Sequence, residues 1–435
     1  MTVTVEPTAD VVATASQTIC DGESTNIALS SNATGTQSVT YTWAAVETVS
    51  PQGGILTFEA NCNSGCGTAI QEQITNTGIT PGEIVYTVTP TIGACMGIAS
   101  TVTVTINPTA QVNDPADLVL CHDASVSSIT FTTDRSGGTT TYTWSTNNDA
   151  IWSLGASGNG HIPFFTVNNT STSPIVAIVT VTPTFTYNGI SCDGDAETFT
   201  ITVNPLGQVN DPADMVVCVD SPVTVNFTTN NNGVGVTSYT WTNTNTNIGL
   251  GASGDGHISF TSANTSTVPI TGIIEVTPTY TNEGVSCVGE TETMTITVNP
   301  PAQVNAIGDQ QLCNGFGTTT VTFATINSGG TTTYTWTNDN TDIGLAASGS
   351  GPEIPQFTAT NSTSAPIVGL ITVTPYFEGC IGETTTFTYT VDPTPTVTSD
   401  AAKLICDEGN VDYTCLLYTS PSPRDRTRSR MPSSA

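Results

Sequence analysis

Cysteines are the residues whose type and spacing most plainly suggest chemistry in this sequence, which contains twelve of them. Eight fall into two series, one early and one late in each of four successive stretches of the chain. The early series is Cys20, Cys121, Cys218 and Cys313, and the late series is Cys95, Cys192, Cys287 and Cys380. Recurrence at matched places is typical of structural disulfides, which form in oxidising compartments.

Two pairings fit this spacing. Bridges between successive stretches would join cysteines 26 residues apart, which requires the chain to double back between them: Cys95–Cys121, Cys192–Cys218, Cys287–Cys313 and Cys380–Cys406. An extended array disfavours such doubling back, so we expect bridges within each stretch: Cys20–Cys95, Cys121–Cys192, Cys218–Cys287 and Cys313–Cys380. Cys62 and Cys66 would close a small loop; their spacing also permits a zinc site, but no second ligand pair lies nearby.

The histidines and carboxylates do not form a catalytic pattern. His161 and His257 follow the similar loops Ser-Gly-Asn-Gly and Ser-Gly-Asp-Gly, which indicates a feature of a repeat, and His122 stands alone. The sequence has no nucleophile elbow and no phosphate-binding glycine loop. We therefore predict no catalytic residues and no enzyme activity in this chain.

Calcium is the one cofactor for which the sequence offers candidate ligands. Asp114 and Asp117 lie in one linker, and Asp211 and Asp214 lie at the matching place in the next. Carboxylate oxygens near a module junction could hold Ca²⁺ and stiffen it. The alternative, which we favour, is that Asp-Pro forms a turn and that aspartate keeps an edge strand soluble.

Charge excludes several kinds of partner. The 435 residues include 36 acidic and only 6 basic side chains, a net charge of −30. Nucleic acids and anionic membrane surfaces require clustered Lys and Arg, so both are excluded as partners. No apolar run is long enough to span a membrane.

Internal repeats indicate the fold. A Tyr-Thr-Trp strand recurs, as does a strand that ends in Val-Thr-Pro, and three of the four repeats carry a Gly/Ser loop between them. Threonine alternating with Val, Ile or Phe predicts short half-buried strands. The fold class expected is all-β, a tandem array of immunoglobulin-like β-sandwich domains arranged as beads on a string. The expected core tryptophans are Trp43, Trp144, Trp241 and Trp336, with sugar stacking as the alternative; Trp152 occurs once, in a loop, and is the better contact candidate.

The repeats also predict domain boundaries. Residues 1–8 match the last strand of a preceding, truncated repeat, and residues 394–414 match the start of a truncated fifth repeat. Residues 415–435 back-translate into a string that resembles a sequencing adapter, so we expect an unstructured artefact there, in a fragment such as metagenomic sequencing yields. The four whole repeats expected are 9–108, which diverges from the others, 109–205, 206–300 and 301–393.

Residues 334–393 carry the pattern Tyr-Thr-Trp-Thr-Asn, Ala-Ala-Ser-Gly, Val-Thr-Pro, Gly-Cys and Phe-Thr-Tyr-Thr-Val-Asp-Pro. This pattern resembles the PKD-like repeats of very long Bacteroidetes surface proteins, many of which end in a gliding-motility-associated or type IX secretion module. The resemblance covers about 109–393, whereas 9–108 departs from it because it lacks the Gly/Ser loop. It implies a bacterial protein of the cell surface and no catalytic residues.

The function expected is therefore that of a non-catalytic extracellular adhesin or stalk whose surface ligand, a glycan or a protein, is unknown. One alternative is a spacer region in a secreted polysaccharide-degrading enzyme. Another is a glycan- or protein-binding module that uses loops 151–165 and 247–258 for contact.

Overall fold

The computed structural model describes residues 5–13, 15–59 and 61–396. Part of the expected strand at 1–8, nearly all of 394–414 and the whole of 415–435 lie outside the described residues, as does Cys406. The described chain consists of β-strands and three short 3-10 helices, which confirms the all-β prediction.

Four six-stranded sheets follow one another along the chain. In the second sheet the strand order is β12-β19-β17-β14-β15, with β18 hydrogen-bonded to β17. Its strands are β12 (Leu118–Cys121), β14 (Thr139–Thr146), β15 (Ser157–Asn159), β17 (Ile175–Tyr187), β18 (Ile190–Asp193) and β19 (Glu197–Asn204). A separate two-stranded sheet of β13 (Ser125–Val126) and β16 (Phe165–Thr166) supplies other strands of this repeat.

The third and fourth sheets repeat this order. The third comprises β20 (Met215–Cys218), β22 (Val236–Asn243), β23 (Ser253–Asp255), β25 (Ile270–Asn282), β26 (Val285–Val288) and β27 (Glu292–Asn299), beside the pair β21 (Pro222–Val225) and β24 (Ile258–Thr261). The fourth comprises β28 (Gln310–Cys313), β30 (Thr332–Asn338), β31 (Ser348–Ser350), β33 (Ile367–Phe377), β34 (Cys380–Ile381) and β35 (Thr385–Asp392), beside β29 (Val321–Thr322) and β32 (Glu353–Ile354).

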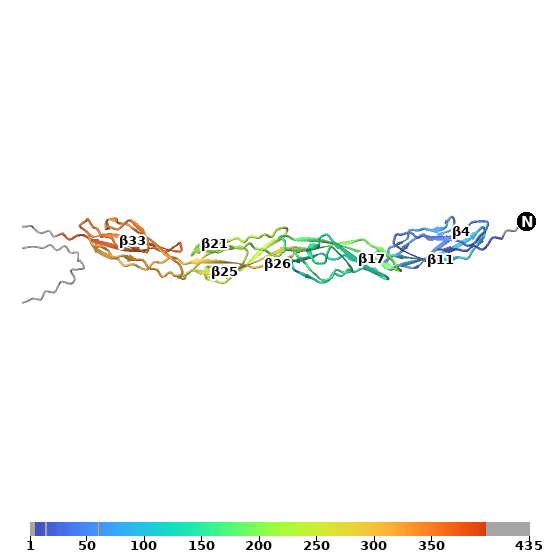
Figure 1. Ribbon diagram of the computed structural model, residues 1–435, viewed down its shortest axis with the longest axis horizontal. Helices are drawn as coiled ribbons and strands as arrows, with labels where there is room; N and C mark the ends of the chain where they lie inside the picture. Colours follow the sequence, from blue (N-terminus) through green and yellow to red (C-terminus); the bar gives the residue numbers. More distant parts are fainter. Residues whose placement is uncertain (1–4, 14, 60, 397–435) are drawn as a thin grey trace, which may run out of the picture. The chain divides into compact units, whose positions relative to one another are not determined.

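The first sheet has the order β2-β11-β9-β4-β6, with β10 on β9. Its strands are β2 (Gln17–Cys20), β4 (Val39–Val49), β6 (Asn61–Cys62), β9 (Gly82–Ile92), β10 (Cys95–Met96) and β11 (Ser100–Asn107). Two small sheets accompany it, one of β1 (Val12–Ala13), β3 (Ile27–Ser30) and β7 (Ala69–Ile70), the other of β5 (Leu56–Thr57) and β8 (Thr75–Asn76). Strands of successive repeats can be followed by colour in Figure 1.

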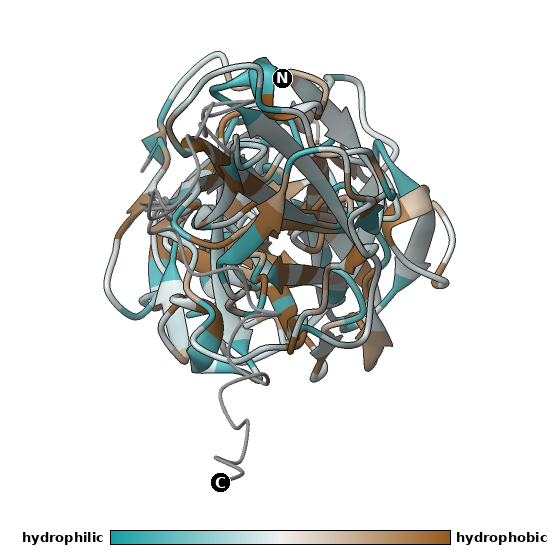
Figure 2. Cartoon of the chain, turned by 90° about the vertical axis from the view of Figure 1, so that its left-hand side faces the viewer, coloured by the Kyte–Doolittle hydropathy of each residue, from teal (hydrophilic) through white to brown (hydrophobic). Residues whose placement is uncertain are grey.

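Alternation of side chains builds each core. In β17 every second residue from Ala177 to Phe185 is buried, while the threonines and other residues between them reach the surface more. Figure 2 colours the chain by residue hydropathy, with hydrophilic and hydrophobic segments mixed along the strands. The 3-10 helices η1 (Asp149–Ile151), η2 (Thr246–Ile248) and η3 (Thr341–Ile343) each bury one isoleucine, and an asparagine side chain caps each at its N-terminus.

The chain divides into two compact units, within which repeats 9–108 and 109–205 lie wholly in the first and 301–393 wholly in the second. The repeat 206–300 contributes to both, since Asn230–Ser238 and Thr279–Glu290 belong to the first unit. Each predicted repeat contains one six-stranded sheet and one cluster of buried apolar residues. The four tryptophans expected in the cores are buried, with exposed fractions between 4% and 8%.

Candidate functional site

Disulfides join each repeat to the next. The bridges are Cys20–Cys192, Cys121–Cys287 and Cys218–Cys380, each with Cα atoms 5.5 Å apart. The pairings expected within repeats are therefore wrong: Cys20–Cys95, Cys121–Cys192, Cys218–Cys287 and Cys313–Cys380. The alternative pairs 26 residues apart that fall within the described residues, Cys95–Cys121, Cys192–Cys218 and Cys287–Cys313, are wrong as well. Cys62 and Cys66 are bonded to each other, which leaves no thiolate for the zinc alternative.

The sheet register explains this pairing. Each early cysteine ends the first strand, which runs parallel to the last strand, so Cys121 lies beside Asn204 where the chain leaves the repeat. Cys192, on the hairpin strand β18, pairs with Phe185. Along β17 that position lies ten residues from Ile175, which is close to the Asn204 end. Ten strand residues span roughly 33 Å, whereas disulfide-bonded Cα atoms lie within about 7 Å, so a bridge within the repeat cannot form.

Two cysteines, Cys95 and Cys313, are free although they occupy the same positions in the sheet register as the bridged cysteines of other repeats. Cys95 pairs with Ile92 across its hairpin, as Cys380 does with Phe377. Cys313 lies beside Asp392 at the end of its first strand, as Cys121 does beside Asn204. Neither is bonded to another described cysteine; Cys95 is exposed and Cys313 is half-buried. Both therefore occupy positions whose counterparts in the other repeats form the bridges between repeats.

Hydrogen bonds between loops accompany each bridge. The carbonyl two residues before a proline accepts the backbone N–H of a loop in the following repeat: Ile79 from Ser136 at 3.0 Å, Thr172 from Asn232 at 2.8 Å and Thr267 from Ser328 at 3.1 Å. The residue after each donor is a glycine with φ between 80° and 95°, packed against that same proline (Gly137, Gly233 and Gly329). Positive φ strongly favours glycine, so the loop is specified by its sequence.

A buried asparagine shapes the accepting loop. In the third repeat Asn264 Nδ2 donates to the carbonyls of Val268 at 2.9 Å and Val298 at 2.8 Å, and its Oδ1 accepts from the Ser266 N–H at 2.9 Å. Asn76, Asn169 and Asn361 make matching bonds in the other repeats. The pattern Asn-x-(Gly, Ser or Thr)-x-x-Pro occurs four times in the sequence, and this recurrence is the signal by which these asparagines could have been predicted.

Two of the four calcium candidates are engaged within their own repeat. The carboxylate of Asp117 accepts from the Thr200 N–H at 2.6 Å, and that of Asp214 accepts from the Thr295 N–H at 2.7 Å. Asp309 does the same with Thr388 in the fourth repeat. Among the described residues no three His, Cys, Asp or Glu side chains are grouped so that they could hold a metal ion. Calcium at Asp114, Asp117, Asp211 and Asp214 receives no support from this geometry.

The contact with Thr200 predicts a pH effect. Hydrogen bonds from the Thr200 backbone and hydroxyl hold the pKa of Asp117 below its usual range. A carboxyl group whose pKa is lowered by folding stabilises the folded state at pH values above its unfolded-state pKa, which is about 3.9. This stabilisation is lost as the pH falls through the pKa of the folded state. The melting temperature of the second repeat should therefore fall as the pH is lowered below about 4, and it should fall less steeply in Asp117→Asn than in the unsubstituted protein. Asp114→Asn is the control; an equal flattening there would contradict this role.

The repeated histidines brace loops. His161 Nδ1 accepts the Phe131 N–H at 3.0 Å, and His257 Nδ1 accepts the Phe227 N–H at 3.0 Å. In the fourth repeat, where the sequence has Pro352-Glu353, the matching N–H of Phe323 is bonded to the Pro352 carbonyl instead. His122 Nδ1 similarly accepts the Asn169 N–H. These contacts assign the imidazoles to loop structure.

Trp152, the expected contact residue, is a core residue instead. It is 6% exposed, lies edge-on to Trp144 and Phe165, and donates from Nε1 to the Gly155 carbonyl at 3.0 Å. Its small helix η1 folds it back onto the sandwich, which its isolated place in the sequence did not reveal.

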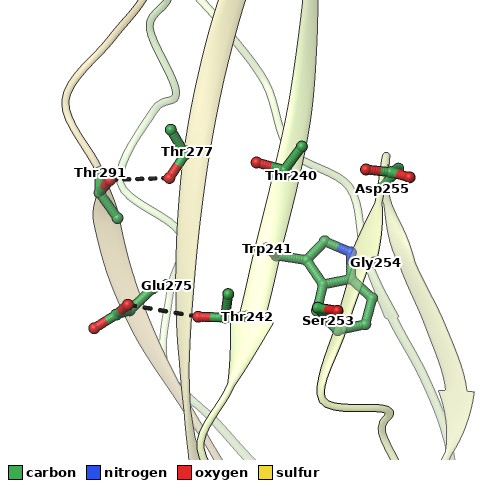
Figure 3. A pocket seen from close by; sticks show the side chains of 9 residues that line it. All are labelled: Thr240, Trp241, Thr242, Ser253, Gly254, Asp255, Glu275, Thr277 and Thr291. Atoms are coloured by element: carbon green, nitrogen blue, oxygen red, sulfur yellow. Dashed lines mark hydrogen bonds between the residues drawn. The ribbon is translucent and has the colours of Figure 1, made fainter.

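A shallow pocket lies over Trp241 in the third repeat (Figure 3). Asp255 on β23 and Glu275 on β25 are its acidic lining residues, and Glu275 accepts from Thr242 Oγ1 at 3.5 Å. The other lining residues are Thr240, Ser253, Gly254, Thr277 and Thr291. The lining of this pocket includes no His, Cys, Lys or Arg side chain.

Comparison with known proteins supports the fold. Residues 17–110 match the model of the PKD-like domain family. The match falls on the repeat that lacks the Gly/Ser loop, not on the three repeats in which we noted the resemblance. No curated protein matches the chain.

Solved structures with tandem sandwich domains are similar at low identity. Three titin immunoglobulin domains share 10% identity over 68% of this chain and 100% of theirs, with a TM-score of 0.33. Drosophila N-cadherin EC1-4 shares 11% over 87% and 100%, with a TM-score of 0.28. The human desmocollin-1 ectodomain shares 10% over 93% and 84%, with a TM-score of 0.26.

Proposed function

We propose that this chain is part of a non-catalytic extracellular stalk or adhesin, made of PKD-like repeats with the boundaries 9–108, 109–205, 206–300 and 301–393. The observation that carries the proposal is the set of disulfides between repeats. A bridge between successive repeats ties the modules into one structural element, whereas an active site would require only one of them.

The location proposed is a bacterial cell surface. Structural disulfides persist in secreted and surface proteins and are rare in reducing cytosol. The resemblance to Bacteroidetes surface repeats supports a role in adhesion, of the kind associated with gliding motility and type IX secretion. No helix among the described residues is long and apolar enough to cross a membrane.

The burial of the candidate aromatic residues favours a stalk over a dedicated glycan-binding module. Trp152, the aromatic residue expected to contact a ligand in loop 151–165, is packed inside its own repeat. The core tryptophans, the other candidates for sugar stacking, are also buried. A spacer in a secreted polysaccharide-degrading enzyme would use the same junctions, so it differs from the proposal in neighbouring domains rather than in these residues.

Antibody labelling of intact source cells tests the proposal. An antibody against the described repeats should label unpermeabilised cells, and deletion of the gene should reduce adhesion to a surface. Labelling that appears only after lysis would contradict the surface location. Unchanged adhesion, combined with loss of polysaccharide degradation, would favour the enzyme spacer.

A further inference from the structure

The three bridges between repeats overlap along the sequence. The bridge Cys20–Cys192 spans 172 positions, Cys121–Cys287 spans 166 and Cys218–Cys380 spans 162. Each loop closed by one bridge begins before the preceding loop has ended. Bridges within repeats would instead close separate loops joined only by linkers.

Overlap creates a short covalent route through the chain. From Cys20 the route crosses to Cys192, follows the backbone to Cys218 and crosses to Cys380. The backbone part is the 26 residues that separate Cys192 from Cys218, which contain the strands β19 and β20 and the linker between them. Both strands are already extended, so this route has little slack.

We infer that the disulfides Cys20–Cys192 and Cys218–Cys380, with the 26-residue segment between Cys192 and Cys218, carry tension along the array, and that thiol-disulfide exchange switches the array between an inextensible and an extensible tether. The inference rests on the proposed stalk function and adds a regulation to it. The remaining bridge, Cys121–Cys287, lies on a second and longer route, which follows the backbone for 101 positions from Cys20 to Cys121 and for 93 positions from Cys287 to Cys380.

Most of each sandwich core lies off the tension route. Trp43 and Trp144 fall inside the loop that Cys20–Cys192 closes, and Trp241 and Trp336 fall inside the loop that Cys218–Cys380 closes. Force applied at the two ends therefore reaches the bridges before it can pull these strands apart. Unfolding of the cores adds no length while the bridges are intact.

The lengths follow from chain geometry. A 26-residue segment reaches at most about 90 Å when fully extended, which limits the separation of Cys20 and Cys380. With every bridge reduced, the direct route between them is the whole backbone of 360 positions, with a reach of about 1,200 Å. Reduction by a dithiol converts each bridge into two thiols and oxidises one dithiol to its disulfide, so electrons and protons balance.

Single-molecule pulling of the full chain between its termini tests the inference. Oxidised protein should show no extension from unfolding of the repeats at forces that unfold sandwiches, apart from the terminal segments outside Cys20 and Cys380. Dithiothreitol should add about 1,100 Å of contour length between these two cysteines. Stepwise unfolding to full length without reductant would overturn the inference.

Paired substitutions supply a matched control. In the double variant with Cys218→Ser and Cys380→Ser, the shortest route in oxidised protein crosses from Cys20 to Cys192, runs back along the chain to Cys121, crosses to Cys287 and continues to position 380. Its backbone part is about 160 residues, which reach about 550 Å when fully extended. In the double variant with Cys121→Ser and Cys287→Ser, the 26-residue route is unchanged. The contour length of the oxidised protein between positions 20 and 380 should therefore equal that of the unsubstituted chain. Equal lengthening in both variants would overturn the inference, even if one of them folds poorly, because the lengths depend only on which bridges exist.

The result is separable from the proposed function. A chain that lies on the cell surface but lengthens fully without reductant would leave the stalk proposal standing and refute the tension route. A chain that is absent from the cell surface but inextensible when oxidised would refute the stalk proposal and leave the tension route standing.

Discussion

Replacement of Asn264 by alanine should destabilise the third repeat by about 3 kcal/mol, because the change leaves the buried carbonyl of Val298 without its donor and releases the loop that ends at Pro269. Asn264 is only 3% exposed, so water cannot replace these bonds without opening the loop. The free energy of unfolding measured by denaturant titration, with the disulfides intact, gives the magnitude.

The same substitution should loosen the junction that follows. The Thr267 carbonyl, which the Asn264 loop positions, accepts the Ser328 N–H of the fourth repeat at 3.1 Å. Hydrogen exchange at Ser328 should therefore accelerate in Asn264→Ala and not in Thr265→Ala, whose side chain is exposed in the same loop. Faster exchange confined to the third repeat's own strands would show that the asparagine stabilises its loop without positioning the junction.

Replacement of Trp241 by alanine should cost the third repeat about 3–5 kcal/mol, the usual loss for a large buried aromatic side chain. Trp241 is 8% exposed, and its buried Nε1 has no hydrogen-bond partner in the structure, so its contribution is packing. Gly254 lies directly against it, and a Cβ there would approach the indole to 2.4 Å. Thermal unfolding followed by tryptophan fluorescence of the remaining repeats reports whether the loss is local.

The matched control for Trp241→Ala is Val234→Ala, in a loop of the same repeat where the side chain is 84% exposed. That change should leave the melting temperature nearly unaffected. Equal destabilisation by both variants would contradict the assignment of Trp241 to the core. Loss of stability in all four repeats at once would instead indicate that the bridges couple the repeats more strongly than nearest-neighbour contacts do.

The strand pattern was predictable because it depends on local alternation. Threonine alternating with Val, Ile or Phe reads directly as a half-buried strand, and the Tyr-Thr-Trp repeat identifies the strand that supplies the core tryptophan. The all-β fold class follows from these local signals. Trp152 was misjudged because its burial depends on how η1 folds back, which periodicity does not encode.

The disulfide pairing was not predictable in the same way. Sequence spacing does not reveal that β12 runs parallel to β19, which places Cys121 and Cys192 at opposite ends of one repeat. The preference for pairs within a repeat came from rejecting partners 26 residues apart, which would require the chain to double back, and bridges at separations of 162 to 172 residues were not among the alternatives. The equal spacing of 26 residues had a different meaning, since it measures the backbone between successive bridges and not the bridges themselves.

Peptide mapping of the non-reduced protein tests the central claim most directly. Arg135 is the one basic residue before Lys403, so trypsin is unsuitable and pepsin at low pH, which also suppresses exchange between thiols and disulfides, is the appropriate protease. The account predicts linked peptides that contain Cys20 with Cys192, Cys121 with Cys287, and Cys218 with Cys380. Linked peptides that contain Cys121 with Cys192, or Cys218 with Cys287, would contradict it.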